Sequence, residues 1–185
     1  MTGRLIGSAW RHDVARLGAG LLAITGLAAA ATALLFAGEA RSVLAVHFAP
    51  PPATAGDAAG IWLHNLRCEL GVAVFAFLDP ACRRLIDGAK PLWRRLLVGV
   101  GDVCVAGWAT GSSIVAGVLL GAYGMRQLEA FLPDGPVEVT AWLLLLVLYL
   151  DVRRGRASAR TAEVSLFVIA ALLAVAAVFE VGALA

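Results

Sequence analysis

Residues 17–37 read LGAGLLAITGLAAAATALLFA and contain no charged side chain. A helix needs about 20 residues to cross a bilayer, so this stretch by itself predicts a transmembrane helix. Arg4 and Arg11 precede it, as basic residues precede a secretory signal, but the apolar core of a signal has only about 7 to 15 residues. We therefore expect a membrane span and not a cleaved leader.

The rest of the chain has the same apolar character. Of its 185 residues, 61% are hydrophobic and only 15% are charged, whereas a soluble domain carries about 25% charged residues. A globule of this size cannot bury so much apolar surface, because small domains have a high surface-to-volume ratio. The composition excludes a cytosolic enzyme, a disordered tail and, with only three cysteines, a secreted disulfide scaffold. We predict one integral membrane domain over residues 1–185.

Five apolar runs predict an all-α fold, a bundle of five transmembrane helices. The runs cover residues 17–37, 61–78, 96–123, 137–150 and 164–184. The fourth run is short for a span, so we expect either that flanking residues complete a tilted helix or that the bilayer thins there.

The basic residues predict the orientation of these spans. Outside the runs, the six successive segments carry three, one, five, one, four and no Lys or Arg residues. Cytoplasmic loops carry the excess of basic residues, so this alternation predicts a cytoplasmic N-terminus and an extracytoplasmic C-terminus. In this orientation Asp102 lies near the cytoplasmic side, where Arg94 and Arg95 are its neighbours in sequence.

Two pairs of glycines mark the third run as a packing helix. Gly107 and Gly111 form one small-xxx-small pair, and Gly117 and Gly121 form another. Such pairs let helix backbones approach closely in lipid, within one bundle or between copies in an oligomer. Glycines repeated in this way could also line a narrow channel.

Ionisable groups are the exception in these runs, and they gather in one leaflet. An ionisable side chain in lipid costs about 2.5 to 3.5 kcal/mol on insertion scales, so it is a functional candidate by default. The predicted topology places in the outer leaflet, or at its surface, His64, Asn65, Glu69, Asp134, Glu138 and Glu180. Asn65 and Glu69 are four residues apart and share a helix face, as Asp134 and Glu138 would if helical.

Each side chain also has a structural explanation. Glu138 would lie in the first turn of its helix and could complement the helix dipole. Asp134 could cap a turn, Glu180 could reach the headgroups, and His64 could be an interfacial histidine.

Two further residues of the second run are assigned structural or charge-balancing roles. They are Asn65, beside the acids on its face, and Arg67. Arg67 could form an ion pair with Glu69 or Glu138 and so balance a buried charge without chemistry.

Three segments resemble the stage II sporulation protein M family. The segment IWLHNLR, residues 61–67, is similar to the one that opens a span in that family. LPDGPVE, residues 132–138, resembles its His-Gly-x-x-Glu segment, and LAVAAVFE, residues 173–180, resembles its final span. Asp134 stands where the family has histidine, and the Asn-Gly of the glycine-rich span is missing. The resemblance covers most of the chain from about Ile61 onward.

This resemblance implies a multi-pass protein of the bacterial cell membrane. The founding member is a scaffold for peptidoglycan-remodelling partners. Related proteins occur in gene clusters for circular bacteriocins, with proposed roles in maturation, export or immunity. The family therefore does not choose between enzyme and scaffold.

The family segment also suggests a metal site. Its two ligand positions have helical spacing, which Asp134 and Glu138 keep. With His64 and Glu180 they supply one nitrogen and three carboxylates, which could hold zinc or another divalent metal. Metal-bound water is a nucleophile near neutral pH, and Glu69 and Glu138 are the candidate catalytic acids.

Two function classes follow. The first is a membrane-embedded, peptidase-like hydrolase or maturation factor that acts on a hydrophobic peptide at the extracytoplasmic face. The second is a non-catalytic scaffold, export or immunity component for membrane-protein partners, in which the carboxylates hold helices together or pass protons. The lipid bilayer is a partner in both classes, and nucleic acid is a partner in neither.

Overall fold

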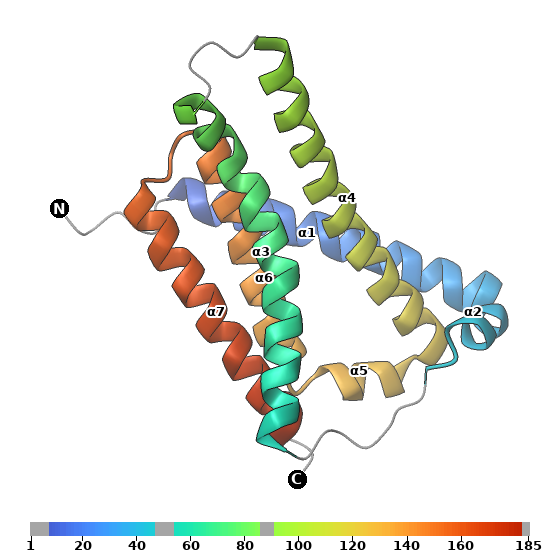
Figure 1. Ribbon diagram of the computed structural model, residues 1–185. Coiled ribbons are helices and arrows are strands. Elements are labelled where there is room, and N and C mark those ends of the chain that lie inside the picture. Colours follow the sequence, from blue (N-terminus) through green and yellow to red (C-terminus); the bar gives the residue numbers. More distant parts are fainter. Residues whose placement is uncertain (1–7, 47–53, 86–90, 183–185) are drawn as a thin grey trace.

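The computed structural model describes residues 8–46, 54–85 and 91–182, and every regular element within these ranges is a helix. The elements are α1 (Ser8–Ala31), the π-helical turn η1 (Thr32–Phe36), α2 (Ala37–Leu44), α3 (Ala55–Leu85), α4 (Pro91–Tyr123), α5 (Met125–Phe131), α6 (Gly135–Arg153) and α7 (Ala159–Gly182) (Figure 1). The all-α class expected from the sequence is confirmed.

Four helical segments of the described residues are long and apolar enough to cross a membrane. They are His12–Leu44, Arg95–Tyr123, Gly135–Arg153 and Ala159–Val181. This matches four of the five predicted runs and gives the chain the character of a membrane protein. Helix α3, which contains the second run, has 31 residues and ample length. The part of it that the structure describes is not among the four.

The helix that contains the fourth run is longer than the run itself. It has 19 residues, because Gly135 and Pro136 start it before the apolar stretch and Asp151 to Arg153 prolong it. Proline at the first helical turn needs no N–H and favours such a start. Flanking residues therefore lengthen this helix beyond the apolar run, as the first of the two alternatives requires.

Two short elements were not predicted. Helix α2 continues the first span beyond η1, and its last residue is followed by Ala45 in the left-handed region, at φ 45°. Helix α5 runs crosswise between the ends of α4 and α6 (Figure 1). Residues 47–53, which include the three consecutive prolines 50–52, and residues 86–90 lie outside the described residues.

The helices form two packed units. In the first unit α3, α6 and α7 surround a core whose most deeply buried side chains are Leu145, Ile169 and Leu173. In the second unit α4 packs along α1, η1 and α2, and α4 also packs against α3 of the first unit, where Val105 joins the same core. The C-terminal half of α4 diverges from α3 toward the end of the bundle that α5 crosses (Figure 1).

One of the two predicted glycine pairs explains how the second unit packs. A Cβ atom on Gly117 would lie 2.7 Å from the Ala28 Cβ, and one on Gly121 would lie 2.8 Å from the Thr32 Cβ. Both distances are too short for real carbon atoms, so α1 approaches α4 as closely as it does only because these residues are glycines. The other pair, Gly107 and Gly111, has open space in front of it.

Candidate functional site

Three helices bring five of the predicted residues into one pocket. Helices α3 and α6 begin, and α7 ends, at the same end of the bundle, so polar residues far apart in sequence meet there (Figure 1). The pocket has a volume of about 470 Å³ and is lined by Gly60, Ile61, His64, Asn65, Asp134, Glu138 and Glu180. Gly60 and Ile61 were not predicted, because neither carries chemistry that a sequence pattern could single out.

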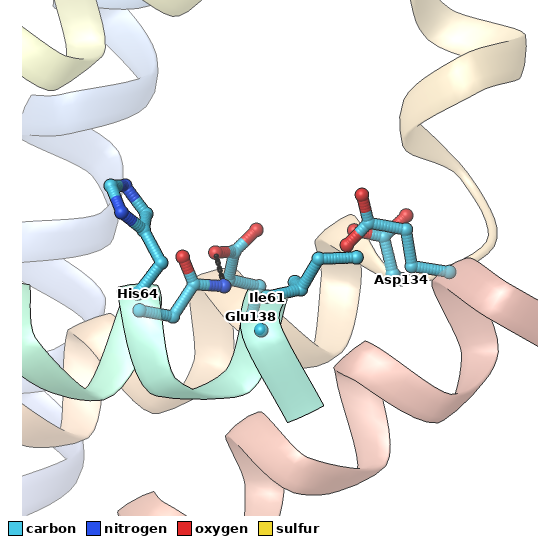
Figure 2. A pocket seen from close by; sticks show the side chains of 7 residues that line it. Ile61, His64, Asp134 and Glu138 are labelled. Atoms are coloured by element: carbon cyan, nitrogen blue, oxygen red, sulfur yellow. Dashed lines mark hydrogen bonds between the residues drawn. The ribbon is translucent and has the colours of Figure 1, made fainter. Parts of the chain in front are cut away.

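A hydrogen bond inside the pocket fixes Glu138. The Asn65 Nδ2 atom donates to the Glu138 Oε1 atom at 2.7 Å (Figure 2). Both side chains are half-buried, and a bond to a carboxylate is stronger than one between neutral groups. Glu138 also lies in the first turn of α6, where the helix dipole favours a negative charge. The Asn65 side chain of α3 is thus linked to the Glu138 side chain of α6.

Asp134 is the residue before α6, but its side chain does not cap the helix. No capping hydrogen bond is made by this side chain, so it remains directed to the pocket that it lines. Burial raises the pKa of Asp134, and the amides of Asp134 and Gly135 oppose this rise only in part. The turn-capping role stays an alternative for this side chain.

The predicted metal ligands share the pocket without forming a cluster. Figure 2 shows His64 at one end of the pocket and Asp134 at the other, with Glu138 between them. Among the described residues, no group of three or more His, Cys, Asp or Glu side chains could hold a metal ion. The zinc site stays a prediction from the sequence, and no chemical step is derived from it.

Glu69 does not line the pocket. It lies one helical turn beyond Asn65 on the same face of α3. The residue is only 3% exposed, and its carboxylate is repelled by the like charge of Glu138. Neither of its carboxylate oxygens has a hydrogen-bond partner. Arg67 is exposed and does not donate to it, so the predicted ion pair with Glu69 is not formed.

No family model, curated protein or solved structure matches this chain. The membership suggested by residues 61–67, 132–138 and 173–180 therefore stays a prediction.

The pocket carries acidic charge that nothing in its lining balances. Asp134, Glu138 and Glu180 lie close enough to repel one another. None of the described residues that line the pocket is Lys or Arg. Like charges held together at a partly buried site are stabilised by a cation or by protons, since the low dielectric strengthens every charge interaction. The chemistry of the lining thus favours a positively charged occupant.

Proposed function

We propose that this chain is a multi-pass protein of the bacterial cell membrane with five spans, and that α3 is the fifth. The alternation of basic residues between the runs supports a cytoplasmic N-terminus and an extracytoplasmic C-terminus. The inward faces of α3 support its role as a span, because Val72, Ala73 and Ala76 are buried in the core with α6 and α7. In this orientation the acidic pocket opens at the extracytoplasmic face.

We propose further that the pocket binds a cationic group of a hydrophobic peptide or of a membrane-protein partner, in a non-catalytic export or scaffold role. The observation that carries this proposal is that Asp134, Glu138 and Glu180 line one pocket whose described lining contains no Lys or Arg. The hydrogen bond from Asn65 holds one of the three acids in place before a ligand arrives. Such preorganisation lowers the cost of binding.

Binding of a charged peptide should depend on these acids. The probe is a fluorescent Ala/Leu peptide that carries one lysine, and its reference is the same peptide with norleucine at that position. We expect the Glu180→Gln and Asp134→Asn variants, in lipid nanodiscs, to bind the lysine peptide about tenfold more weakly, which corresponds to about 1.4 kcal/mol per lost charge interaction. Fluorescence anisotropy titrations measure the two Kd values.

The matched control is Glu129→Gln, which neutralises an exposed acid of α5 that does not line the pocket. It should leave binding unchanged. Because burial raises the pKa of Asp134, acidification should neutralise this carboxylate earlier than an ordinary aspartate, and binding should weaken as the pH falls. Equal affinity for the lysine and norleucine peptides would contradict the proposal.

We also propose a hydrolase as a second candidate, which one observation favours. Asn65 holds Glu138 beside a second acid, Asp134, in the same pocket. Two acids in different environments can divide the roles of general acid and general base. In that case the lysine peptide is cleaved, mass spectrometry detects its fragments, and Glu138→Gln abolishes cleavage while binding persists. If the peptide is still intact after prolonged incubation, the hydrolase is contradicted and the non-catalytic role remains.

A further inference from the structure

Glu69 is the most deeply buried acid in the part of the chain that the structure describes. The residue is 3% exposed, whereas the three acids that line the pocket are half-buried. Within the same described residues, neither of its carboxylate oxygens accepts a hydrogen bond. A carboxylate that has neither water nor a partner is strongly unfavourable in a protein interior. A positively charged partner would therefore stabilise this group.

The position of Glu69 along α3 places it between the apolar core and the pocket. Farther from the pocket, the inward face of α3 joins the core with α6 and α7 through Val72, Ala73 and Ala76. Toward the pocket, the next residue of this face is Asn65, whose Nδ2 atom donates to Glu138 at 2.7 Å. Glu69 and Glu138 lie close enough for their carboxylates to repel each other. The two acids thus face each other across α3 and α6, beside Asn65.

Glu138 differs from Glu69 in the groups that stabilise its charge. It accepts from Asn65 and forms a hydrogen bond with the side chain of Trp142. It also lies in the first turn of α6, where the helix dipole favours a negative charge. These groups hold Glu138 in place as an anion, and its charge acts on the partnerless carboxylate of Glu69. A cation between the two carboxylates would remove this repulsion.

The donor atoms around this position are oxygens of the kind that hard divalent cations prefer. They come from the two carboxylates and from Asn65, which has an amide oxygen besides the Nδ2 atom that donates to Glu138. Carboxylates, carbonyl oxygens and water are typical ligands of Mg²⁺, Ca²⁺ and Mn²⁺, whereas zinc prefers nitrogen and sulfur. Mg²⁺ keeps several waters when one or two carboxylates bind it. The adjoining pocket, with a volume of about 470 Å³, has room for such waters.

We propose that Glu69 and Glu138, with Asn65, form a site for one hard divalent cation of the Mg²⁺ and Ca²⁺ type. The buried carboxylate without a hydrogen-bond partner distinguishes this site from a surface cluster of acids. It also differs from the predicted zinc site, whose other ligands belong to the open pocket. The ion bridges α3 and α6 and offsets the cost that Glu69 imposes on the fold when no ion is bound. This inference does not depend on what peptide the pocket binds.

Binding of Mn²⁺, which electron paramagnetic resonance detects directly, tests the site without any peptide. Chelator-treated protein in neutral detergent micelles should bind a single Mn²⁺, and Mg²⁺ and Ca²⁺ should displace it. Glu69→Gln keeps the size of the side chain and removes its charge. Loss of a group that only supports a metal ligand weakens binding about 10- to 100-fold, so loss of a charged ligand should weaken it at least about tenfold. Glu138→Gln should have the same effect, which keeps the test decisive if one variant does not fold.

Thermal unfolding supplies a second measurement. An ion that binds only the folded state raises the melting temperature, so Mg²⁺ or Ca²⁺ should raise the Tm of the chelator-treated wild type and leave that of Glu69→Gln unchanged. Glu163→Gln, which neutralises an exposed acid of α7, is the matched control and should bind Mn²⁺ as the wild type does.

Two pocket variants distinguish the buried site from the open pocket. Asp134→Asn and Glu180→Gln should each weaken Mn²⁺ binding less than Glu69→Gln does. If Glu69→Gln binds Mn²⁺ like the wild type while these two variants lose it, the ion belongs to the open pocket and the proposal is overturned. Folded wild-type protein without saturable Mn²⁺ binding would overturn it as well, and the Glu69 carboxyl group would then hold a proton instead of an ion.

Discussion

A Gly117→Leu substitution should lower the free energy of unfolding by at least about 1–3 kcal/mol, the range for overpacking a well-packed interior. The new Cβ alone would lie 2.7 Å from the Ala28 Cβ, and the backbone of Thr25 is also in its way. Backbone atoms cannot rotate aside as a side chain can, so α1 and α4 would have to separate. Helix association in lipid depends on such close van der Waals packing. Denaturant titration in mixed micelles measures the loss.

The first glycine pair of the same helix supplies the matched control. Nothing lies within 4 Å of a Cβ on Gly107, so Gly107→Leu has room for its side chain. Leucine has a higher helix propensity than glycine, by up to about 1 kcal/mol, so we expect the free energy of unfolding to stay the same or to rise slightly. An equal loss in both variants would show that leucine in α4 is harmful for reasons other than the contact with α1.

Replacement of Glu69 by methionine should, in contrast, raise the free energy of unfolding by about 1–3 kcal/mol. The carboxyl group is buried, and neither oxygen has a hydrogen-bond partner. The fold therefore carries the full desolvation cost of this group, increased by the like charge of Glu138. Methionine has a similar shape and no such cost, and buried charged groups are often replaced by apolar ones with a gain in stability.

Glu163→Met is the control for this substitution, since Glu163 is exposed near the start of α7. We expect its effect to stay within about 0.5 kcal/mol. A destabilised Glu69→Met variant would mean that Glu69 gains more from its surroundings than the structure indicates. A stabilised variant that no longer binds the lysine peptide would assign Glu69 to function, because proteins retain such unfavourable groups where activity needs them.

The long helices could be predicted from the sequence, and the short ones could not. Apolar runs such as residues 96–123 identify their helices because lipid demands a length and a composition that few other segments have. Helix α5 has seven residues and no apolar period long enough to stand out. Helix α2 continues from the first span through a π-helical turn, and no residue type marks such a turn in advance.

In the candidate site, the set of residues could be predicted from the sequence, but their hydrogen-bond partners could not. Topology alone placed His64, Asn65, Asp134, Glu138 and Glu180 in one leaflet, and the structure brings them to one pocket. The partner of each side chain depends on the rotation of one helix against another, which a period of 3.6 residues does not fix. The bond from Asn65 to Glu138, across 73 residues, could therefore not be predicted.

The partners of the Asp102 side chain, at the other end of α6 from the pocket, could not be predicted for the same reason. Arg153 is 51 residues from Asp102, whereas Arg94 and Arg95 are near it in sequence. Sequence proximity favoured the two arginines of the same helix. The structure pairs the carboxylate with α6 because the crossing of the two helices brings Arg153 and Tyr149 to it.

The sidedness of the pocket can be measured directly by cysteine labelling. In a variant whose three cysteines are replaced by serine, Gly60→Cys places a thiol in the pocket lining, and Ser158→Cys places one between α6 and α7. We predict that a membrane-impermeant maleimide labels the Gly60→Cys variant in intact cells, that the lysine peptide slows this labelling, and that the Ser158→Cys variant reacts only after permeabilisation. Labelling of Gly60→Cys only after permeabilisation would contradict an acidic pocket that opens at the extracytoplasmic face.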